Sequence, residues 1–373
     1  MDKIKVGFIG AGGIAKAHAY ALQALKFYYA DVPDIELRAV TSAKQPSRAE
    51  FVEKYGFKKA MDFETFVRDP EINTVYILSP NNMHYKHLDA VMSMEGVERV
   101  YLEKPICSGR DEEEKIAHIF SGKENKNVQA GFQFLFSSPV REALNFWNEQ
   151  DFGRPIHFHF TYKHTDYLKK SYREKRKSRL TPAPDGGAMA DLGSHALSML
   201  IAFFGNSLQI TNALQAGSFP DVPEGSDLYS EISLVDKKTG AVGNLSASRI
   251  SAGMGDVLAF DIYCENGTLR YNSYYPDRFE YCLETDNEWT TNFTGSNFQP
   301  VTSFPSKHMP GGWLRALKHA HYVFLTGNDP RAYIPDMKHG LEVQRLVRET
   351  AGHLKAFRKN HISSEGTSGR LRQ

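Results

Sequence analysis

The chain has 373 residues, 41% of them hydrophobic, and its 45 basic and 44 acidic side chains give a net charge of +1. This length favours two domains, and the balanced charge gives no reason to expect nucleic acid or an anionic membrane as a partner. The three cysteines are too scattered for a disulfide scaffold or a zinc site, so we expect no bound metal. No apolar leader precedes the first strand-like run, and we expect a cytoplasmic protein.

The first 150 residues alternate short β-rich runs with longer amphipathic stretches, which is typical of βαβ units and a parallel sheet. Strands are expected at residues 4–9, 37–40, 74–78, 100–102 and 128–130. Helices are expected at residues 14–25, 83–94, 111–120 and 139–147. We therefore predict a Rossmann-type domain over residues 1–135.

From about residue 151 the strands become longer and lose their intervening helices, which indicates a mainly antiparallel sheet. Strands are expected at residues 156–163, 208–214, 229–235, 241–250, 258–264 and 267–271. Helices are expected at residues 191–204, 313–325 and 340–357. We predict an α/β fold with a second domain over residues 136–358, whose last helices pack back near the first domain, and a flexible tail over residues 359–373.

A glycine turn directly follows the first strand and opens the first helix, with the sequence Gly10-Ala11-Gly12-Gly13-Ile14-Ala15. In this position the glycine spacing is typical of a dinucleotide-binding turn, because glycine lets the backbone approach a pyrophosphate at a helix N-terminus. We predict that Gly10, Gly12, Gly13 and Ile14 contact a nicotinamide dinucleotide.

The end of the second strand bears on the choice of dinucleotide. An acidic residue usually stands there and accepts hydrogen bonds from the adenosine ribose, but this chain has Ser42. A hydroxyl does not repel a 2′-phosphate, and Lys44 or Arg48 could pair with one. The pattern leans slightly toward NADP. NAD is the alternative cofactor, and in that case Lys44 would be a solvent-exposed charge of the loop.

Three motifs together give the chain a resemblance to the Gfo/Idh/MocA family, the group of glucose-fructose oxidoreductase and inositol dehydrogenase. They are the glycine turn, Glu103-Lys104-Pro105 after a strand, and the segment from Gly186 to His195, in that order. The resemblance extends from Lys3 to about Leu354. It implies an open-faced second sheet, a substrate held between the domains, and a homo-oligomer, dimer or tetramer, formed through that sheet.

The resemblance assigns catalysis to Lys104, Asp191 and His195, and the chemistry suits them. Oxidation of a secondary alcohol removes a hydride from carbon and a proton from oxygen, and a neutral imidazole can take that proton. Asp191 lies four residues before His195, so on one helix the two share a face. Lys104 could stabilise a developing alkoxide at the carboxyl end of a strand, and Pro105 is expected to use a cis bond. All three residues are also expected to contact the substrate.

The resemblance further implies cofactor contacts in the turn after the strand expected at residues 74–78 and beyond the next two strands. The residues concerned are Ser79, Pro80, Asn81, His84, Glu103, Lys104 and Gln133. For His84 an equal alternative is a structural role at the start of its own helix.

On the substrate side, Tyr162, Arg249 and Trp313 are candidate contacts, and His308 could close over the same place. Residues 169–179 are strongly basic. A mobile solvated loop is the simpler interpretation of that run, and a lid or contact for acidic groups is the alternative.

These features predict an NAD(P)-dependent oxidoreductase that moves a hydride between nicotinamide and a secondary hydroxyl of a sugar, cyclitol or glycoside. Two alternatives stay open. One is a glycosidase that oxidises its sugar transiently and retains its NAD, and the other is a non-catalytic regulator that keeps the dinucleotide site.

Overall fold

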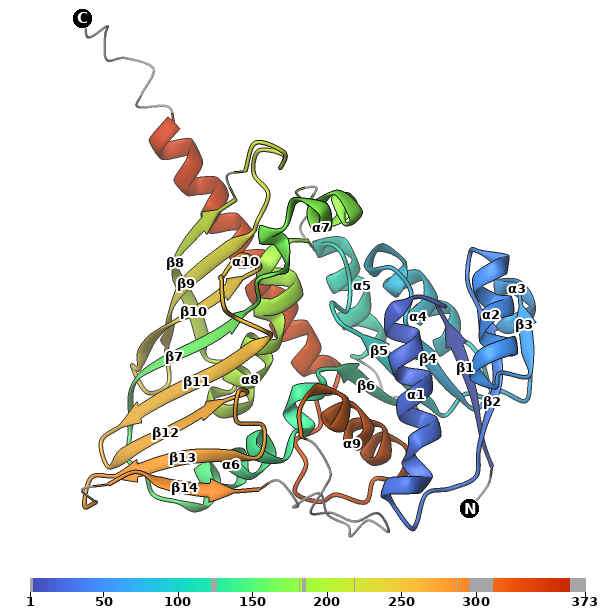
Figure 1. The fold of residues 1–373 in the computed structure, drawn as a ribbon, viewed down its shortest axis with the longest axis horizontal. Coiled ribbons are helices and arrows are strands. Elements are labelled where there is room, and N and C mark those ends of the chain that lie inside the picture. The colour runs from blue at the N-terminus through green and yellow to red at the C-terminus, as the bar shows by residue number, and fades with distance from the viewer. Residues whose placement is uncertain are drawn as a thin grey trace, which may run out of the picture.

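The computed structural model describes residues 3–121, 126–180, 182, 186–217, 219–286, 288–294 and 311–362. Two β-sheets form two lobes, with helices between them (Figure 1). The α/β fold predicted from the sequence is confirmed, with a parallel sheet in the first lobe and a mainly antiparallel sheet in the second.

The first sheet has six parallel strands in the order β3-β2-β1-β4-β5-β6. The strands are β1 (Ile4–Ile9), β2 (Ile35–Thr41), β3 (Lys59–Met61), β4 (Thr74–Ile77), β5 (Arg99–Glu103) and β6 (Asn127–Gly131). β1 and β4 are apolar and largely buried on both faces, as central parallel strands are. The strand order reverses between them, and ligands of open α/β sheets bind in the crevice at such a point.

Helices connect these strands on both faces of the sheet. They are α1 (Gly13–Tyr28), α2 (Gln45–Tyr55), α3 (Phe63–Phe66), α4 (His84–Met92) and α5 (Arg110–Ile119). The helix α2, with β3 after it, was not singled out from the sequence, because α2 is polar and buries only Phe51.

The second sheet has eight strands in the order β14-β13-β12-β11-β7-β10-β9-β8. The strands are β7 (Pro155–Lys163), β8 (Leu208–Ala216), β9 (Tyr229–Asp236), β10 (Val242–Ser248), β11 (Val257–Cys264), β12 (Gly267–Asn272), β13 (Arg278–Leu283) and β14 (Thr290–Phe293). The pair β7–β10 is parallel and the other pairs are antiparallel. Burial alternates along β9, which indicates one covered face and one open face.

Helices α6 (Ser138–Glu149) and α8 (Ser194–Phe204) pack on the second sheet, and helices α9 (Trp313–Thr326) and α10 (Met337–Ile362) contact the first lobe. Contacts place α8 on β7 and α6 on β12 and β13. α9 packs against α1 in the first lobe, and α10 runs from β6 and α5 to α8 and β8 (Figure 1). The last two helices therefore pack back on the first domain.

Several boundaries differ from the sequence prediction. The expected helix over 191–204 is split, with a π-helical turn (Met189–Gly193) followed by α8. The basic run, interpreted from the sequence as a loop, forms the short helix α7 (Lys170–Lys175) and a 3-10 turn (Lys177–Arg179). α10 spans Met337–Ile362 and is thus longer at both ends than the helix expected over residues 340–357. Residues 363–373 and His308 lie outside the described residues.

In the part of the chain that the structure describes, no helix combines the length and apolar character needed to cross a membrane.

Candidate active site

The glycine turn joins β1 to α1 as predicted. Gly10 has a φ of +124°, and a Cβ there would lie 2.4 Å from the carbonyl oxygen of Leu78. At Gly12 and Gly13, by contrast, an added Cβ would meet nothing within 4 Å, so their backbone faces open space. No side chain caps α1 and no acidic residue stands in its first turn. The turn therefore offers free N–H groups and a positive helix end, which fit a pyrophosphate.

At the end of β2, the three residues predicted to read the adenosine ribose adopt different roles. The Ser42 hydroxyl donates to the Lys44 carbonyl at 3.1 Å, and Arg48 donates to the Met61 carbonyl at 2.6 Å. Lys44 is exposed at the start of α2. Of the two cations, Lys44 is the one more available to a bound phosphate.

The loops after β4 and β5 are tied together by His84. Its Nδ1 lies 2.6 Å from the Pro105 carbonyl and its Nε2 lies 2.9 Å from the Ser79 carbonyl. The Lys104–Pro105 peptide is cis, as expected. Burial lowers the pKa of His84, against the opposing effect of its two carbonyl neighbours, and both ring nitrogens face the backbone. This arrangement supports the structural alternative for His84 by fixing the loop that carries Lys104.

In the rest of the turn after β4, Ser79 and Asn81 are half-buried and Pro80 is exposed. Ser79 contacts His87 through its hydroxyl at 2.8 Å, Pro80 precedes the short turn Asn81–Met83, and Asn81 begins it. Glu103, at the end of β5, is buried and lies 3.0 Å from Nε2 of His18 in α1. Their predicted contacts with the cofactor stay predictions.

Lys104 reaches across to the second domain. Its Nζ donates to the backbone carbonyl of Asp191 at 2.6 Å and lies 3.2 Å from the Asp191 Oδ1 atom. The two residues are 87 positions apart in the sequence, so the fold alone brings them together. The Asp191 carboxylate stands in the π-helical turn, a distortion that often occurs at functional sites.

Two arginines hold the other oxygen of Asp191. Arg249 Nη2 lies 2.8 Å from Oδ2, and Arg179 Nη1 lies 3.3 Å from the same atom. Burial acts to raise the pKa of Asp191, but Lys104, Arg249 and Arg179 outweigh it and hold that pKa well below its usual range. Asp191 is therefore ionised throughout the neutral range.

His195 lies in the first turn of α8, inside an aromatic enclosure. Its ring packs edge-on against Phe134 and Phe132, with centroids 5.0 and 6.1 Å away, and lies 5.9 Å from Tyr162. Nδ1 is buried without a hydrogen-bond partner among the described residues. Burial, and then the charge of Lys104, lower the pKa of His195 well below its usual value. The imidazole is therefore neutral at neutral pH and able to accept a proton.

The remaining predicted residues lie around this group. Tyr162 is buried at the end of β7 beside Phe134, and burial raises its pKa far above the usual value. With its amide oriented to satisfy both partners, Gln133 accepts from the Trp313 indole N–H at 2.6 Å and donates to the Gly131 carbonyl. Arg249 is almost fully buried, donates to Asp191 and the Arg179 carbonyl, and stacks over the Tyr167 ring at 4.8 Å.

Sequence reasoning missed two parts of the site. Phe132 and Phe134 flank Gln133 directly after a parallel strand, and bulky aromatics in that position were a signal for a ligand-facing wall. Arg179 belongs to the basic run at residues 169–179, and its ion pair with Asp191 could not be predicted because Asp191 lies outside that run.

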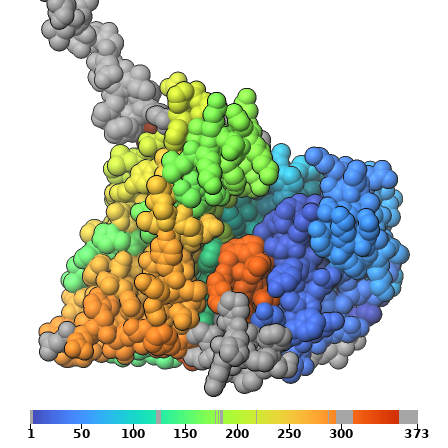
Figure 2. All heavy atoms as spheres, in the orientation of Figure 1, coloured from blue at the N-terminus to red at the C-terminus, as the bar shows by residue number. Residues whose placement is uncertain are grey.

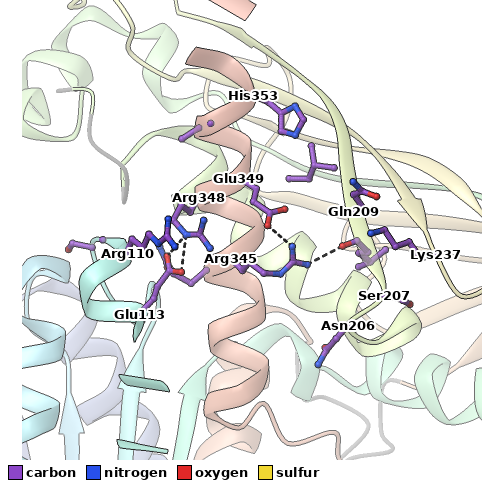
Figure 3. A pocket seen from close by; sticks show the side chains of 17 residues that line it. Arg110, Glu113, Asn206, Ser207, Gln209, Lys237, Arg345, Arg348, Glu349 and His353 are labelled. Carbon is purple, nitrogen blue, oxygen red and sulfur yellow. Dashed lines mark hydrogen bonds and ion pairs between the residues drawn. The ribbon is translucent and has the colours of Figure 1, made fainter. Parts of the chain in front are cut away.

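A separate groove lies on the other side of α10, between α5, the turn after α8 and β8 (Figure 3). Two ion pairs lie within the groove, Arg348 with Glu113 and Arg345 with Glu349. None of the predicted site residues lines it.

The fold and the side chains at its crevice place the chain in the class of two-domain, dinucleotide-dependent oxidoreductases. Comparison with known families makes this specific. The profile described as "Oxidoreductase family, NAD-binding Rossmann fold" matches residues 4–132, and the "GFO/IDH/MocA C-terminal domain" matches residues 140–270. The chain belongs to the Gfo/Idh/MocA family, which confirms the resemblance seen in its motifs.

Individual relatives agree. The chain is 24% identical over 310 residues to levoglucosan dehydrogenase of Pseudarthrobacter phenanthrenivorans, which is 77% of this chain and 78% of that protein. It is 26% identical over 215 residues to glucose-6-phosphate 3-dehydrogenase of Bacillus subtilis, 57% of each chain. The solved structure of levoglucosan dehydrogenase with NADH and levoglucosan superposes with a TM-score of 0.83, at 20% identity, over 94% of this chain and 97% of that one.

Proposed function

We propose that the protein oxidises a secondary hydroxyl of a sugar, cyclitol or glycoside, with NAD or NADP as the hydride acceptor. The observation that carries this proposal is a neutral, buried His195 whose Nδ1 has no partner among the described residues, close to the ammonium group of Lys104. The names of the relatives, which are dehydrogenases of sugars, support the same substrate class.

The residues divide the proton chemistry between them. His195 accepts the hydroxyl proton and becomes an imidazolium. Lys104 keeps its positive charge beside the reacting oxygen and stabilises the negative charge that develops there. Asp191 holds the Lys104 ammonium in place through its carbonyl and carboxylate oxygens. The product is a ketone.

A bound nicotinamide would supply the site that accepts the hydride. The open backbone at Gly12 and Gly13 would hold its pyrophosphate, and Ser79, Pro80, Asn81, Glu103 and Gln133 would surround the nicotinamide ribose and amide. At the adenosine end, Ser42 and the exposed Lys44 stand where an acid would select against a 2′-phosphate. We propose that this end accepts NADP as well as NAD.

The substrate would lie against the aromatic enclosure. Tyr162 and Phe134 form its inner wall, and Trp313 stands at the start of α9, the helix that joins the lobes. Sugar rings present apolar C–H faces and polar edges, and such faces pack on aromatic rings while the hydroxyl groups bond to charged side chains.

We further propose that the open face of the second sheet forms a homo-oligomer. Ile156 on β7, Val242 on β10 and Leu214 on β8 expose 45 to 54% of their surface there, although β-branched and aliphatic side chains favour burial. Light scattering of the purified protein should give a multiple of 42.1 kDa, and Val242→Lys should reduce that mass. A monomer in the unaltered protein would contradict this.

The test of the proposed activity is a screen of sugars, cyclitols and aryl glycosides with NAD and with NADP. Nicotinamide absorbance and aglycone release are followed together. Net reduction of the nucleotide supports the dehydrogenase. Aglycone release without net reduction would support the glycosidase with retained NAD, and nucleotide binding without turnover of any compound would support the regulator.

A further inference from the structure

The charges around Asp191 do not balance. Lys104, Arg179 and Arg249 all make an ion pair with this single carboxylate. Within the described ranges, none of these three cations pairs with a second carboxylate. The nearby Asp227 attracts Arg249 from beyond ion-pair distance and accepts from the Met189 amide at 2.8 Å and the Ser230 hydroxyl at 2.7 Å. Asp191 is therefore the one carboxylate among the described residues in direct contact with the three cations, and Arg179 has no second acid to balance its charge.

The three cations differ in how far they are removed from water. The Arg249 side chain is 2% exposed and that of Lys104 is 13% exposed, whereas that of Arg179 is 57% exposed. A cation removed from water needs a nearby negative charge, and Asp191 supplies that charge to Arg249 and Lys104. Arg179 makes the longest contact with Asp191, at 3.3 Å, and only its Nη1 donates a hydrogen bond to a described residue. The surplus charge is thus concentrated at the accessible edge of the site.

The backbone of Arg179 is nevertheless firmly anchored. Its carbonyl accepts from Arg249 Nη1 at 3.2 Å, and the next carbonyl, that of Leu180, accepts from the Ser226 hydroxyl. Leu180 is buried in a small apolar cluster with Tyr167 and Leu228. An accessible side chain on a fixed backbone is suited to binding a ligand, because little conformational entropy of the loop is lost.

The helix that leads to Arg179 is anchored as well. Arg173 in α7 forms two hydrogen bonds with the carboxylate of Asp221, at 2.7 and 2.9 Å, and stacks on Phe219 at 4.3 Å. It also donates to the Tyr167 and Leu168 carbonyls. This segment, bright green in Figure 2, stands above the junction of the two lobes. Of the basic residues in it, Arg179 is the one that contacts Asp191.

We propose that the substrate carries an anionic oxygen group, a carboxylate or a phosphate, and that Arg179 binds this group. The proposal rests on the proposed function, since it names the class of sugar or cyclitol that the Lys104–His195 site oxidises. A guanidinium presents a planar fork of donors that matches both groups in two-pronged hydrogen bonds. The anion would also supply the negative charge that the cluster lacks.

The experiment compares compounds matched in their ring hydroxyls, namely glucose, glucuronate and glucose 6-phosphate, and the same three forms of galactose. kcat/KM is measured with the native enzyme and with Arg179→Gln, Arg179→Lys and Arg176→Gln. Arg176 is a fitting control because it is an exposed cation of the same segment without an ion pair among the described residues. Binding of each compound to the enzyme–NADH complex is measured by calorimetry in parallel.

The native enzyme should prefer an anionic member of a set by about ten- to a hundredfold, the value of one charge-assisted contact. Arg179→Gln should bring the ratio of anionic to neutral kcat/KM close to one, Arg179→Lys should keep part of it, and Arg176→Gln should leave it unchanged. Preference for the uronate or for the phosphate identifies which group is bound. The preference should shrink as salt rises.

Two failures are distinguishable. If no compound reduces the nucleotide, the proposed dehydrogenase function fails, and the calorimetric comparison still decides the role of Arg179. If neutral compounds bind and react as well as the anionic ones, or if Arg179→Gln weakens both to the same extent, the anion site is wrong while the dehydrogenase stands.

Discussion

The ammonium group of Lys104 donates to the backbone carbonyl of Asp191 at 2.6 Å, and lies 3.2 Å from its carboxylate. This contact joins the residue that follows β5 in the first domain to the π-helical turn of the second. It places a fixed positive charge at the start of α8, where His195 stands. The position of the charge therefore depends on how the two domains pack, and not on either domain alone.

Replacement of Lys104 or His195 should abolish turnover and spare cofactor binding. Lys104→Met and His195→Asn should each lower kcat by about 10²- to 10⁴-fold, the usual contribution of a proton-transferring or charge-stabilising group. Folding should survive Lys104→Met because Arg249 and Arg179 still neutralise Asp191. Turnover is followed by nicotinamide absorbance and NADH binding by fluorescence. Lys86→Met, on the exposed side of α4, is the control, and near-normal turnover in both site variants would refute the assignment.

The pH profile should reflect the depressed pKa of His195. Burial, and then Lys104, hold this pKa well below 6.5, so the imidazole stays in its basic form as the pH falls through 6.5. kcat/KM for alcohol oxidation, which reports the free enzyme, should therefore stay level from pH 8 to about pH 6. Initial rates at constant ionic strength, after a stability check at each pH, would measure it. A tenfold fall per pH unit beginning near 6.5, absent in His195→Asn, would contradict the depressed pKa.

Two glycines of the same turn should respond differently to the same substitution. Gly10→Ala places a Cβ 2.4 Å from the Leu78 carbonyl at a φ of +124°, and should cost at least about 1–3 kcal/mol of stability. Gly12→Ala meets nothing within 4 Å and should keep its melting temperature. It should nevertheless weaken NADH binding about tenfold or more, because the added methyl group occupies the approach of the pyrophosphate. Thermal melts with and without NADH separate the two effects, and equal losses of stability would disprove the distinction.

Acid should destabilise the fold through buried histidines. Burial lowers the pKa of His339 to about 4, from 6.5 in an unfolded chain. Unfolding therefore takes up a proton between these values, and stability that is complete above pH 6.5 is lost as the pH falls toward 4. Between pH 7 and pH 5 this one group accounts for roughly 2 kcal/mol.

The variant His339→Gln cannot take up that proton, so its melting temperature should fall by fewer degrees between pH 7 and pH 5 than that of the native protein. His353→Gln, at an exposed position of α10, should keep the native pH dependence. If His339→Gln and His353→Gln have the same slope as the native protein, His339 does not contribute to the acid sensitivity.

The sequence by itself determined the local units of this protein. The apolar run of β1, the glycine turn and α1 follow from period and turn chemistry within about 25 residues, and repetition of such units predicts a parallel sheet. The motifs around Lys104 and His195 were visible because each is continuous in the chain. The short strands β13 and β14 were missed, since neither has a strong apolar run.

Only the tertiary structure decided which charges meet. Asp191 lies 87, 58 and 12 positions from Lys104, Arg249 and Arg179, and each side chain alone resembles an ordinary polar residue. It also decided that β7 pairs in parallel with β10, and that Phe132 and Phe134 enclose His195. The periodicity of a segment indicates which of its residues are buried, but not which distant segment it packs against. The contacts of Asp191 with three distant cations depend on that packing, so the sequence pattern could not predict them.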